Sequence, residues 1–235
     1  APQQKRLWHL HKNGSTFSSQ SSVLIEGNLQ PEILQTAIGQ VVNHHDILKT
    51  NFYRPPGVKT PVMVFEDRNS FNWEYLNLSA LSEKDISNKI QELLWQERQE
   101  YQNLFQVLLR LYLIKLSDTQ HILIISLPAL CADTRTIKNL VNQISQAYAQ
   151  CSQGKAFSKD YVQYVQFSEW QNQLLDDEDA PASEEYWQQQ KINSLSALKL
   201  PLERQVKNEE FVSDSYKLVI NQELLEKIND FGMGG

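Results

Sequence analysis

The segment that decides the fold is an apolar run that ends in a turn and leads into an amphipathic helix. It reads Ile124-Ile125-Ser126-Leu127-Pro128-Ala129-Leu130-Cys131-Ala132-Asp133-Thr134. Many acyl-transfer sites are built at such a strand-to-helix junction, with a histidine in the turn as the general base. Here the turn offers Pro128 and Ala129, and neither side chain can accept a proton. The segment therefore has the form of a catalytic loop without its base.

The residues on either side of this segment predict the centre of a sheet. Residues 121–127 are nearly all apolar, which is typical of a strand buried on both faces. Residues 109–116 alternate between apolar and polar side chains, and the short turn at 117–120 joins the two runs. We therefore expect an antiparallel hairpin in the middle of the sheet. Residues 134–150 follow as a helix with its apolar side chains at helical spacing.

The rest of the chain alternates in the same way between strand and helix patterns, which predicts a mixed α/β domain. Pro31 begins a helix, Ser82 caps another, and Pro55-Pro56-Gly57 breaks a strand. The expected strands are 22–26, 50–53, 61–65, 109–116, 121–127 and 216–220. The expected helices follow Pro31, span 82–98, 134–150, 161–175 and 183–191, and begin again at Gln222, with an acidic loop at 176–179.

Composition excludes several classes of protein. A hydrophobic content of 41% and a charged content of 21% are typical of a globular chain. A net charge of −6 without a run of Lys or Arg argues against nucleic acid as a partner. No apolar segment has the roughly 18–20 residues that a membrane span needs. Two cysteines fit a reducing compartment, so we expect a cytoplasmic protein. No metal-ligand cluster or phosphate-binding glycine loop is present, so neither a metal nor a cofactor is expected in the domain.

Four motifs in the same order and spacing carry a family resemblance. Residues 1–8 look like the opening Ser/Ala-x-x-Gln-x-Arg-Leu-Trp motif of the condensation domains of nonribosomal peptide synthetases. Residues 44–52 are similar to the second motif, Arg-His-Glu-x-Leu-Arg-Thr-x-Phe, and residues 161–167 to the fourth, Tyr-x-Asp-Tyr/Phe-Ala-x-Trp. Glu185-Tyr186-Trp187 and Leu200-Pro201-Leu202 fall where the family has its Tyr-Trp helix and its Leu-Pro segment. The match covers essentially the whole chain.

The resemblance implies a chloramphenicol-acetyltransferase-like lobe, with a mixed, mostly antiparallel sheet flanked by helices. It identifies residues 1–235 as the N-terminal lobe of a condensation-like domain, with the second lobe absent from this chain. The implied substrates are carried on the phosphopantetheine arms of carrier proteins. The implied partners are carrier protein domains, neighbouring synthetase domains and a recruited tailoring enzyme.

The third family motif, His-His-x-x-x-Asp-Gly, falls on residues 128–134. Ala129 replaces the histidine that the family is understood to use as a base or to orient the intermediate, and Pro128 replaces the other histidine. Loss of a general base typically costs about 10²–10⁴-fold in rate. We therefore assign no catalytic residue here. We expect Asp133 to cap the following helix and Lys49 to support the loop by pairing with Asp133 as a point charge. Thr134 stands where the family has glycine, which reduces backbone freedom and space.

Other residues that carry chemistry fit structural roles better than catalytic ones. His121 lies eight residues before Ala129, about 26 Å along a strand at about 3.3 Å per residue, so it cannot replace the base. We expect it to be an exposed residue at the start of a strand. Cys131 is expected to be a small buried hydrophobe, because no cation next to it lowers its pKa. His44 and His45 are expected to be structural. Four tryptophans are expected to pack in the core or between lobes: Trp73, Trp95, Trp170 and Trp187.

Three functional hypotheses follow. In the first, a condensation-like domain no longer forms peptide bonds and serves as a scaffold or recruitment domain. In the second, it is an atypical acyl or aminoacyl transferase between carrier-bound substrates that does not use the motif histidine and relies on positioning. The third, a generic α/β binding module, is disfavoured by the four motifs in register. The family consists of acyltransferases that form amide bonds. Whether this chain is an enzyme therefore depends on whether the reaction can proceed without the histidine that Ala129 replaces.

Overall fold

The computed structural model describes residues 1–12, 17–58, 61–65, 71–100, 104, 108–158, 161–176, 180–190 and 218–233. The chain forms two compact units, Ala1–Asn193 and Ser194–Gly235. The first unit contains the sheets and the loop at 128–134, and the second contains helix α7 (Gln222–Met233). Among the described residues, no helix combines the length and hydropathy needed to cross a membrane.

The main sheet of the first unit has four strands in the order β1 (Ser18–Glu26), β6 (Gln120–Pro128), β5 (Leu109–Lys115) and β4 (Phe71–Asn77). β6 pairs antiparallel with both β1 and β5, whereas β4 pairs parallel with β5. The predicted hairpin of 109–116 and 121–127 is therefore confirmed, and it occupies the centre of the sheet. The expected mixed, mostly antiparallel arrangement is confirmed with it.

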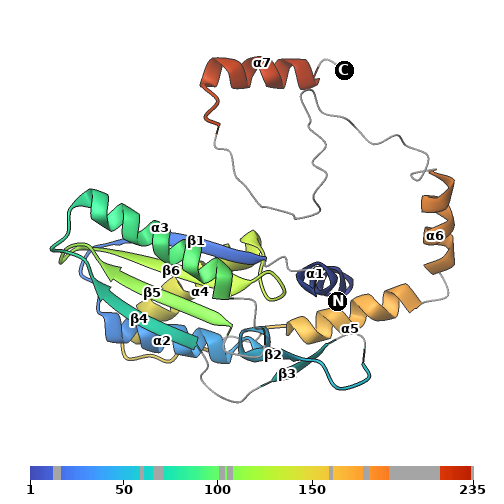
Figure 1. Ribbon diagram of the computed structural model, residues 1–235, viewed down its shortest axis with the longest axis horizontal. Helices are drawn as coiled ribbons and strands as arrows, with labels where there is room; N and C mark the ends of the chain where they lie inside the picture. The colour runs from blue at the N-terminus through green and yellow to red at the C-terminus, as the bar shows by residue number, and fades with distance from the viewer. Residues whose placement is uncertain are drawn as a thin grey trace. The chain divides into compact units, whose positions relative to one another are not determined.

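Both faces of β6 are covered by helices. Leu123, Ile125 and Leu127 belong to the core that includes residues of α2 (Pro31–Asn43) and α4 (Thr134–Cys151). Ile124 points to the other face, where it packs in a smaller core with Leu93 of α3 (Glu83–Glu100). Figure 1 shows α3 and α2 on opposite sides of the sheet. Each Leu or Ile that folding removes from water contributes about 1.5–3 kcal/mol, so the buried side chains of this strand contribute substantially to the stability of the unit.

Local signals set the beginnings of the helices. α2 begins at Pro31, whose fixed φ suits the first helical position. Ser82 precedes α3, and its Oγ accepts a hydrogen bond from the Asp85 N–H at 3.3 Å. α3 is also anchored by the buried carboxylate of Glu97, which accepts hydrogen bonds from Arg110 Nε at 2.7 Å and Tyr112 Oη at 2.6 Å. A buried charge needs such partners to offset its lost hydration.

The structure also contains elements that the sequence patterns did not predict. α1 (Pro2–Lys12) is a helix with few apolar residues, so its periodicity is weak. β4 adds a parallel edge strand, and its alternating Phe71, Trp73 and Tyr75 were a usable signal for it. Strands β2 (Thr50–Tyr53) and β3 (Val62–Phe65) form as predicted, but they pair in a separate two-stranded sheet. A 3₁₀ turn, η1 (Asp46–Lys49), precedes β2.

The C-terminal half of the chain confirms the predicted helices and corrects a strand. α5 (Tyr164–Asp176), α6 (Ala180–Gln189) and α7 lie where helices were expected. Residues 218–220 have no regular structure, so the strand predicted at 216–220 is wrong over these three residues. Residues 216–217, the Leu200–Leu202 segment and most of the acidic loop at 176–179 lie outside the described residues.

Two predictions about burial need correction. His121 is only 3% exposed, because its side chain points to the same covered face of β6 as Leu123 rather than to solvent. Trp73 packs against the main core as expected, but Trp95, Trp170 and Trp187 are each more than half exposed. For these three tryptophans a position in the core of this chain is excluded, whereas the alternative of a position between lobes stays a prediction.

The buried His121 makes the stability of the fold depend on pH. Burial, and then the ammonium group of Lys115 on the facing strand, lower the pKa of His121 below 6.5, while Asp118 opposes this shift. The unfolded chain therefore takes up a proton more readily than the folded chain. The stability contributed by neutral His121 is complete above about pH 6.5 and is lost as the pH falls below that value.

We predict that His121→Leu will flatten the decrease of the unfolding free energy between about pH 7 and pH 5. Urea denaturation followed by circular dichroism at several pH values measures this slope. The exposed His9→Leu variant is the matched control. An identical slope for His121→Leu and the wild-type protein would show that His121 is not the group responsible.

Candidate functional site

The candidate site is the loop that joins β6 to α4. Pro128 is the last residue of β6, Ala129 and Leu130 turn away from the sheet, and α4 begins at Thr134. The turn is closed by hydrogen bonds from the N–H groups of Cys131 and Ala132 to Pro128 O, at 2.8 and 3.2 Å. The Ala129 N–H donates to Phe17 O at 2.9 Å. The loop is thus a defined turn at the end of the central strand, with a methyl group at position 129.

Side chains from two distant segments hold the loop in place. Gln4 of α1 donates from Nε2 to Leu130 O at 2.8 Å, and Ser19 of β1 donates from Oγ to Ala132 O at 2.6 Å. Gln4 is buried on the same side of α1 as Leu7 and Trp8, which pack against the main core. The sequence analysis missed this role, although the spacing of Gln4, Leu7 and Trp8 places the three on one helical face.

Asp133 caps α4 as predicted. Its Oδ1 accepts hydrogen bonds from the N–H and the Oγ1 of Thr136, both at 2.7 Å. The N–H bond and then the hydroxyl bond lower the pKa of Asp133 below its usual value, because both stabilise the carboxylate. Thr134 is exposed at the first position of the helix, so its side chain stands outside the core.

Lys49 does not make the pairing that the sequence analysis expected. Its Nζ lies 3.5 Å from Asp46 Oδ1 and 3.4 Å from Asn43 O. Asp46 is three residues away on the same turn, so this ion pair forms at little cost in conformational entropy. The carboxylate of Asp133 is meanwhile occupied by Thr136. Lys49 therefore supports η1 and the end of α2, and the expected Lys49–Asp133 contact is replaced by these local ones.

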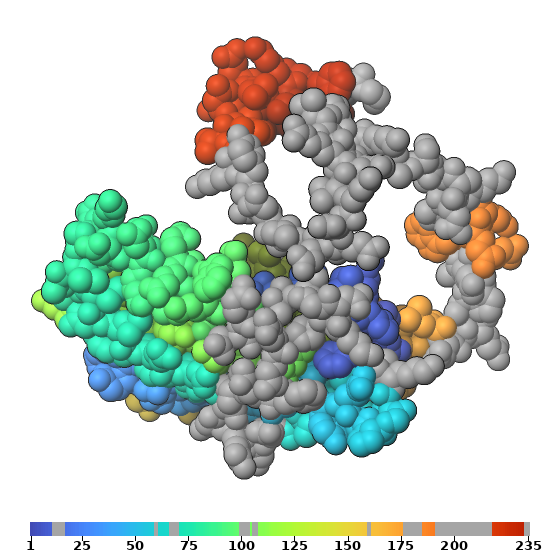
Figure 2. Space-filling model, viewed as in Figure 1, coloured from blue at the N-terminus to red at the C-terminus, as the bar shows by residue number. Residues whose placement is uncertain are grey.

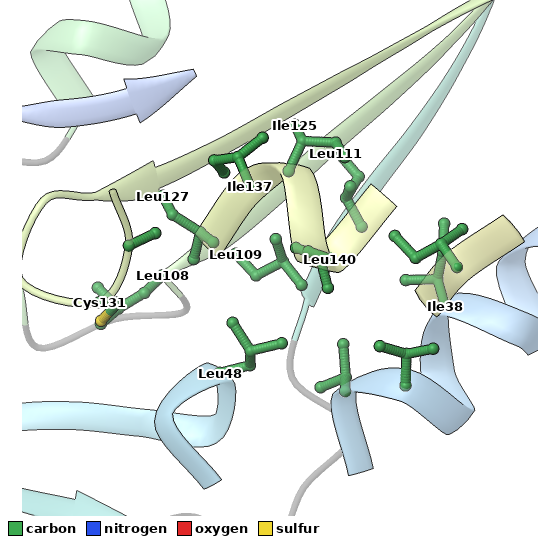
Figure 3. Close-up of a cluster of buried hydrophobic side chains, with 14 of the residues drawn as sticks. Ile38, Leu48, Leu108, Leu109, Leu111, Ile125, Leu127, Cys131, Ile137 and Leu140 are labelled. Carbon is green, nitrogen blue, oxygen red and sulfur yellow. The ribbon is translucent and has the colours of Figure 1, made fainter. Parts of the chain in front are cut away.

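The ionisable side chains around the loop are poorly suited to act as a base. Cys131 is buried beside Leu108 and Leu127, as Figure 3 shows, and burial raises the pKa of its thiol. Burial also raises the pKa of Tyr164, and the neighbouring Cys131 and Asp133 add to this shift. Both groups thus keep their protons at neutral pH. Cys131 is a core residue, as predicted.

The second and fourth motifs contact each other beside the loop. Gln163 donates from Nε2 to His44 O at 3.0 Å, and its Oε1 accepts the Asp46 N–H at 3.0 Å. The ring of His44 is within 3.0 Å of Phe157 O through Nε2, and that of His45 is hydrogen-bonded to Gln143 of α4. Both histidines therefore have structural partners, as expected, and they tie α2 to α4 and to the segment before α5.

No group of three or more His, Cys, Asp or Glu side chains that could hold a metal ion occurs in the part of the chain that the structure describes. At the loop, Cys131 and Tyr164 keep their protons, and the carboxylate of Asp133 is engaged by Thr136.

Comparison with known proteins gives the class. The family model of the condensation domain matches residues 1–232. Tyrocidine synthase 2 of Brevibacillus parabrevis is 27% identical over 97% of this chain and 6% of its own length. The isonitrile lipopeptide synthase of Mycobacterium tuberculosis is 26% identical over 86% of this chain and 8% of its own. The chain thus spans less than a tenth of these relatives.

Solved structures give the fold. The crystal structure of the starter condensation domain of the rhizomide synthetase RzmA superimposes with a TM-score of 0.70 at 17% sequence identity, over 83% of this chain and 48% of that chain. This chain belongs to the condensation-domain family of nonribosomal peptide synthetases and has its chloramphenicol-acetyltransferase-like fold.

The cap formed by Asp133 leads to a stability prediction. Asp133→Ala should lower the free energy of unfolding by about 1 kcal/mol, because the Thr136 N–H loses its acceptor. Asp133→Asn should keep most of this stability, since an amide oxygen also caps a helix. The wild-type advantage over Asp133→Asn should shrink as the pH falls toward 3.8 and below, where the carboxylate is protonated. Urea denaturation of the three proteins measures these differences, and equal losses in both variants would contradict the capping role.

Proposed function

We propose that this chain is the N-terminal part of a condensation-like domain that has lost standard peptide-bond-forming activity and acts as a scaffold or recruitment domain of a nonribosomal peptide synthetase. The observation that carries the proposal is Ala129, at the position of the family's motif histidine, within a loop that is otherwise well formed. Gln4, Ser19 and the Asp133 cap hold the loop. A formed loop that lacks a base can still bind a partner or a substrate, but it cannot accept a proton from the attacking amine.

Amide-bond formation needs a proton to leave the attacking amine, and a methyl group offers no lone pair for it. The neighbouring groups do not compensate. The thiol of Cys131 is buried with a raised pKa, Tyr164 retains its proton, and His45 is engaged with Gln143. The intact geometry of the loop also supports a second candidate, an atypical acyl or aminoacyl transferase that works by positioning alone.

The proposed partners are carrier protein domains, whose phosphopantetheine arms would bring the substrates, together with neighbouring synthetase domains and a recruited tailoring enzyme. A mutant of the RzmA domain was solved in complex with C8-CoA, which ends in the same kind of arm. The domain itself is proposed to hold no cofactor. We place it in the cytoplasm, because Cys131 and Cys151 are both free.

We further propose that a second lobe completes the domain. α5 carries a row of apolar side chains that are exposed in this chain: Phe167 is 43%, Trp170 53% and Leu174 47% exposed. The rings of Phe167 and Trp170 lie 5.7 Å apart, so they form one continuous surface. A surface of this kind is normally covered by another protein element. This chain matches 48% of the length of the RzmA condensation domain, so about half of that domain has no counterpart in this chain.

Restoring the missing base tests the scaffold hypothesis. In the full two-lobed protein, the natural sequence should show no peptide transfer between loaded carrier proteins. Ala129→His, with Pro128→His added, should raise the transfer rate by up to about 10²–10⁴-fold, because the histidine supplies a general base. Ala129→Gln is the control, since it adds a side chain of similar size without a base. Mass spectrometry of the carrier-bound products measures the rate. Transfer by the natural protein would contradict the scaffold hypothesis and favour the positioning mechanism.

The second lobe leads to a separate prediction about exposure. When this chain is extended by its natural C-terminal sequence, acrylamide should quench Trp170 less than it does in this chain, because the lobe covers α5. Trp95 on α3 should be quenched equally in both proteins. Trp170→Phe and Trp95→Phe variants assign the two contributions to the fluorescence. Unchanged quenching of Trp170 would contradict the proposal that a second lobe covers α5.

A further inference from the structure

Helix α5 is seated on the first unit with its polar side inward. Four of its described side chains are at least partly buried, and each carries a polar group: Tyr164, Ser168, Gln171 and Asn172. These four side chains, the polar row, lie on one helical face, because their spacing is i, i+4, i+7 and i+8. Ser168 is only 4% exposed. α5 therefore buries polar groups at the positions where a helix that packs on a core normally has apolar ones.

The apolar side chains of α5 point in another direction. Phe167, Trp170 and Leu174, the apolar row, are exposed. Figure 2 shows α5, in amber, at the surface of the first unit. Phe167 and Trp170 each precede a member of the polar row by one position. Because successive residues of a helix are about 100° apart around its axis, a roll of α5 by about this angle would exchange the two rows.

The buried side of α5 contains a polar atom without a partner. Oε1 of Gln171 is enclosed and accepts no hydrogen bond within the described part of the chain. A buried acceptor that stays unpaired costs free energy, and so does an apolar side chain that stays in water. The described position of α5 carries both costs, and a roll that exposes the polar row relieves both. The enclosure of Oε1 also argues against a ligand on the polar row, because no ligand atom could reach it in this position.

The described hydrogen bonds to other elements hold α5 at its beginning. Gln163, the residue before the helix, bonds through its side chain to His44 O and to the Asp46 N–H. Beyond the first turn, the hydrogen bond described for an α5 side chain stays within the helix, from Gln173 Nε2 to Glu169 Oε1 at 3.2 Å. The helix can therefore turn about its own axis while Gln163 keeps the chain before it in place.

The beginning of α5 lies next to the candidate loop. Burial, and then the neighbouring Cys131 and Asp133, raise the pKa of Tyr164, the first member of the polar row. Cys131 is 8% exposed in this arrangement. Because Tyr164 belongs to the polar row, a roll that exposes this row also moves Tyr164 away from the loop. The position of α5 thus decides how well Cys131 is covered.

We infer that α5 is a two-position helix, which couples the covering of its apolar row to the loop at 128–134. A second lobe that covers the apolar row holds α5 in the described position, with Tyr164 beside the loop. Without this cover, α5 rolls transiently, buries the apolar row and withdraws Tyr164. The identity of the cover rests on the second lobe of the proposed function, whereas the roll is a property of this chain alone.

Hydrogen exchange and thiol alkylation of this chain test the inference, in a Cys151→Ser background that leaves Cys131 to report on the loop. Gln171→Leu replaces the unpaired amide by an apolar group, and Trp170→Gln removes the largest side chain of the apolar row. Both changes favour the described position, so each should slow the amide exchange of α5 and the alkylation of Cys131 about tenfold. Gln173→Leu is the matched control, because it makes the same change as Gln171→Leu at an exposed position and should leave both rates nearly unchanged.

Circular dichroism and the urea midpoint verify that each variant is folded, and the two variants change different rows, so a folding defect in one leaves the other to decide. Unaltered rates in both variants, or an equal effect of Gln173→Leu, would overturn the inference. So would exchange of α5 only through global unfolding, or slower exchange of α5 without slower alkylation of Cys131. Because neither readout measures transfer, active peptide transfer would contradict the scaffold proposal and leave this inference standing.

Discussion

The burial of β6 on both faces from Leu123 to Pro128 is the constraint on which the rest of the structure depends. Its side chains alternate between two cores, with Leu123, Ile125 and Leu127 against α2 and α4 and Ile124 against α3. A strand buried in this way must hydrogen-bond along both edges, and β1 and β5 supply these bonds. Because β6 packs on both faces and pairs on both edges, the position of its last residue is fixed. The loop at 128–134 starts from this residue, so its starting point is fixed as well.

The family motifs, which lie far apart along the sequence, are joined by hydrogen bonds, and one of these bonds reaches this loop. Gln4 of the first motif bonds to the loop itself, and Gln163 of the fourth bonds to the backbone on both sides of His45 in the second. Such contacts remove the freedom of the backbone without adding a reactive group. A loop can therefore keep its shape after its base is lost, which is the state proposed for this domain. The same supports would orient a histidine placed at position 129.

Much of the fold could be predicted because its signals are local. The apolar run at 121–127, Pro31, Ser82 and Asp133 each act through neighbouring residues, and each lies where the structure uses it. The missed elements lacked strong local signals or depended on distant partners. α1 has little apolar periodicity, and it is stabilised by packing Leu7 and Trp8 against the main core. The pairing of β2 with β3 outside the main sheet is likewise invisible in either strand alone.

At the candidate site, too, local features could be predicted from the sequence, whereas contacts between distant segments could not. The absence of a base at Ala129, the cap at Asp133 and the family itself can be read from the residues, because they depend on side-chain chemistry and on spacing. Only the tertiary structure decided that Lys49 pairs with Asp46, that His121 is buried and that Gln4 holds the loop. These outcomes depend on which segments meet in space. The sequence shows which interactions each side chain is able to make, whereas the packing of the folded chain determines which partner it contacts.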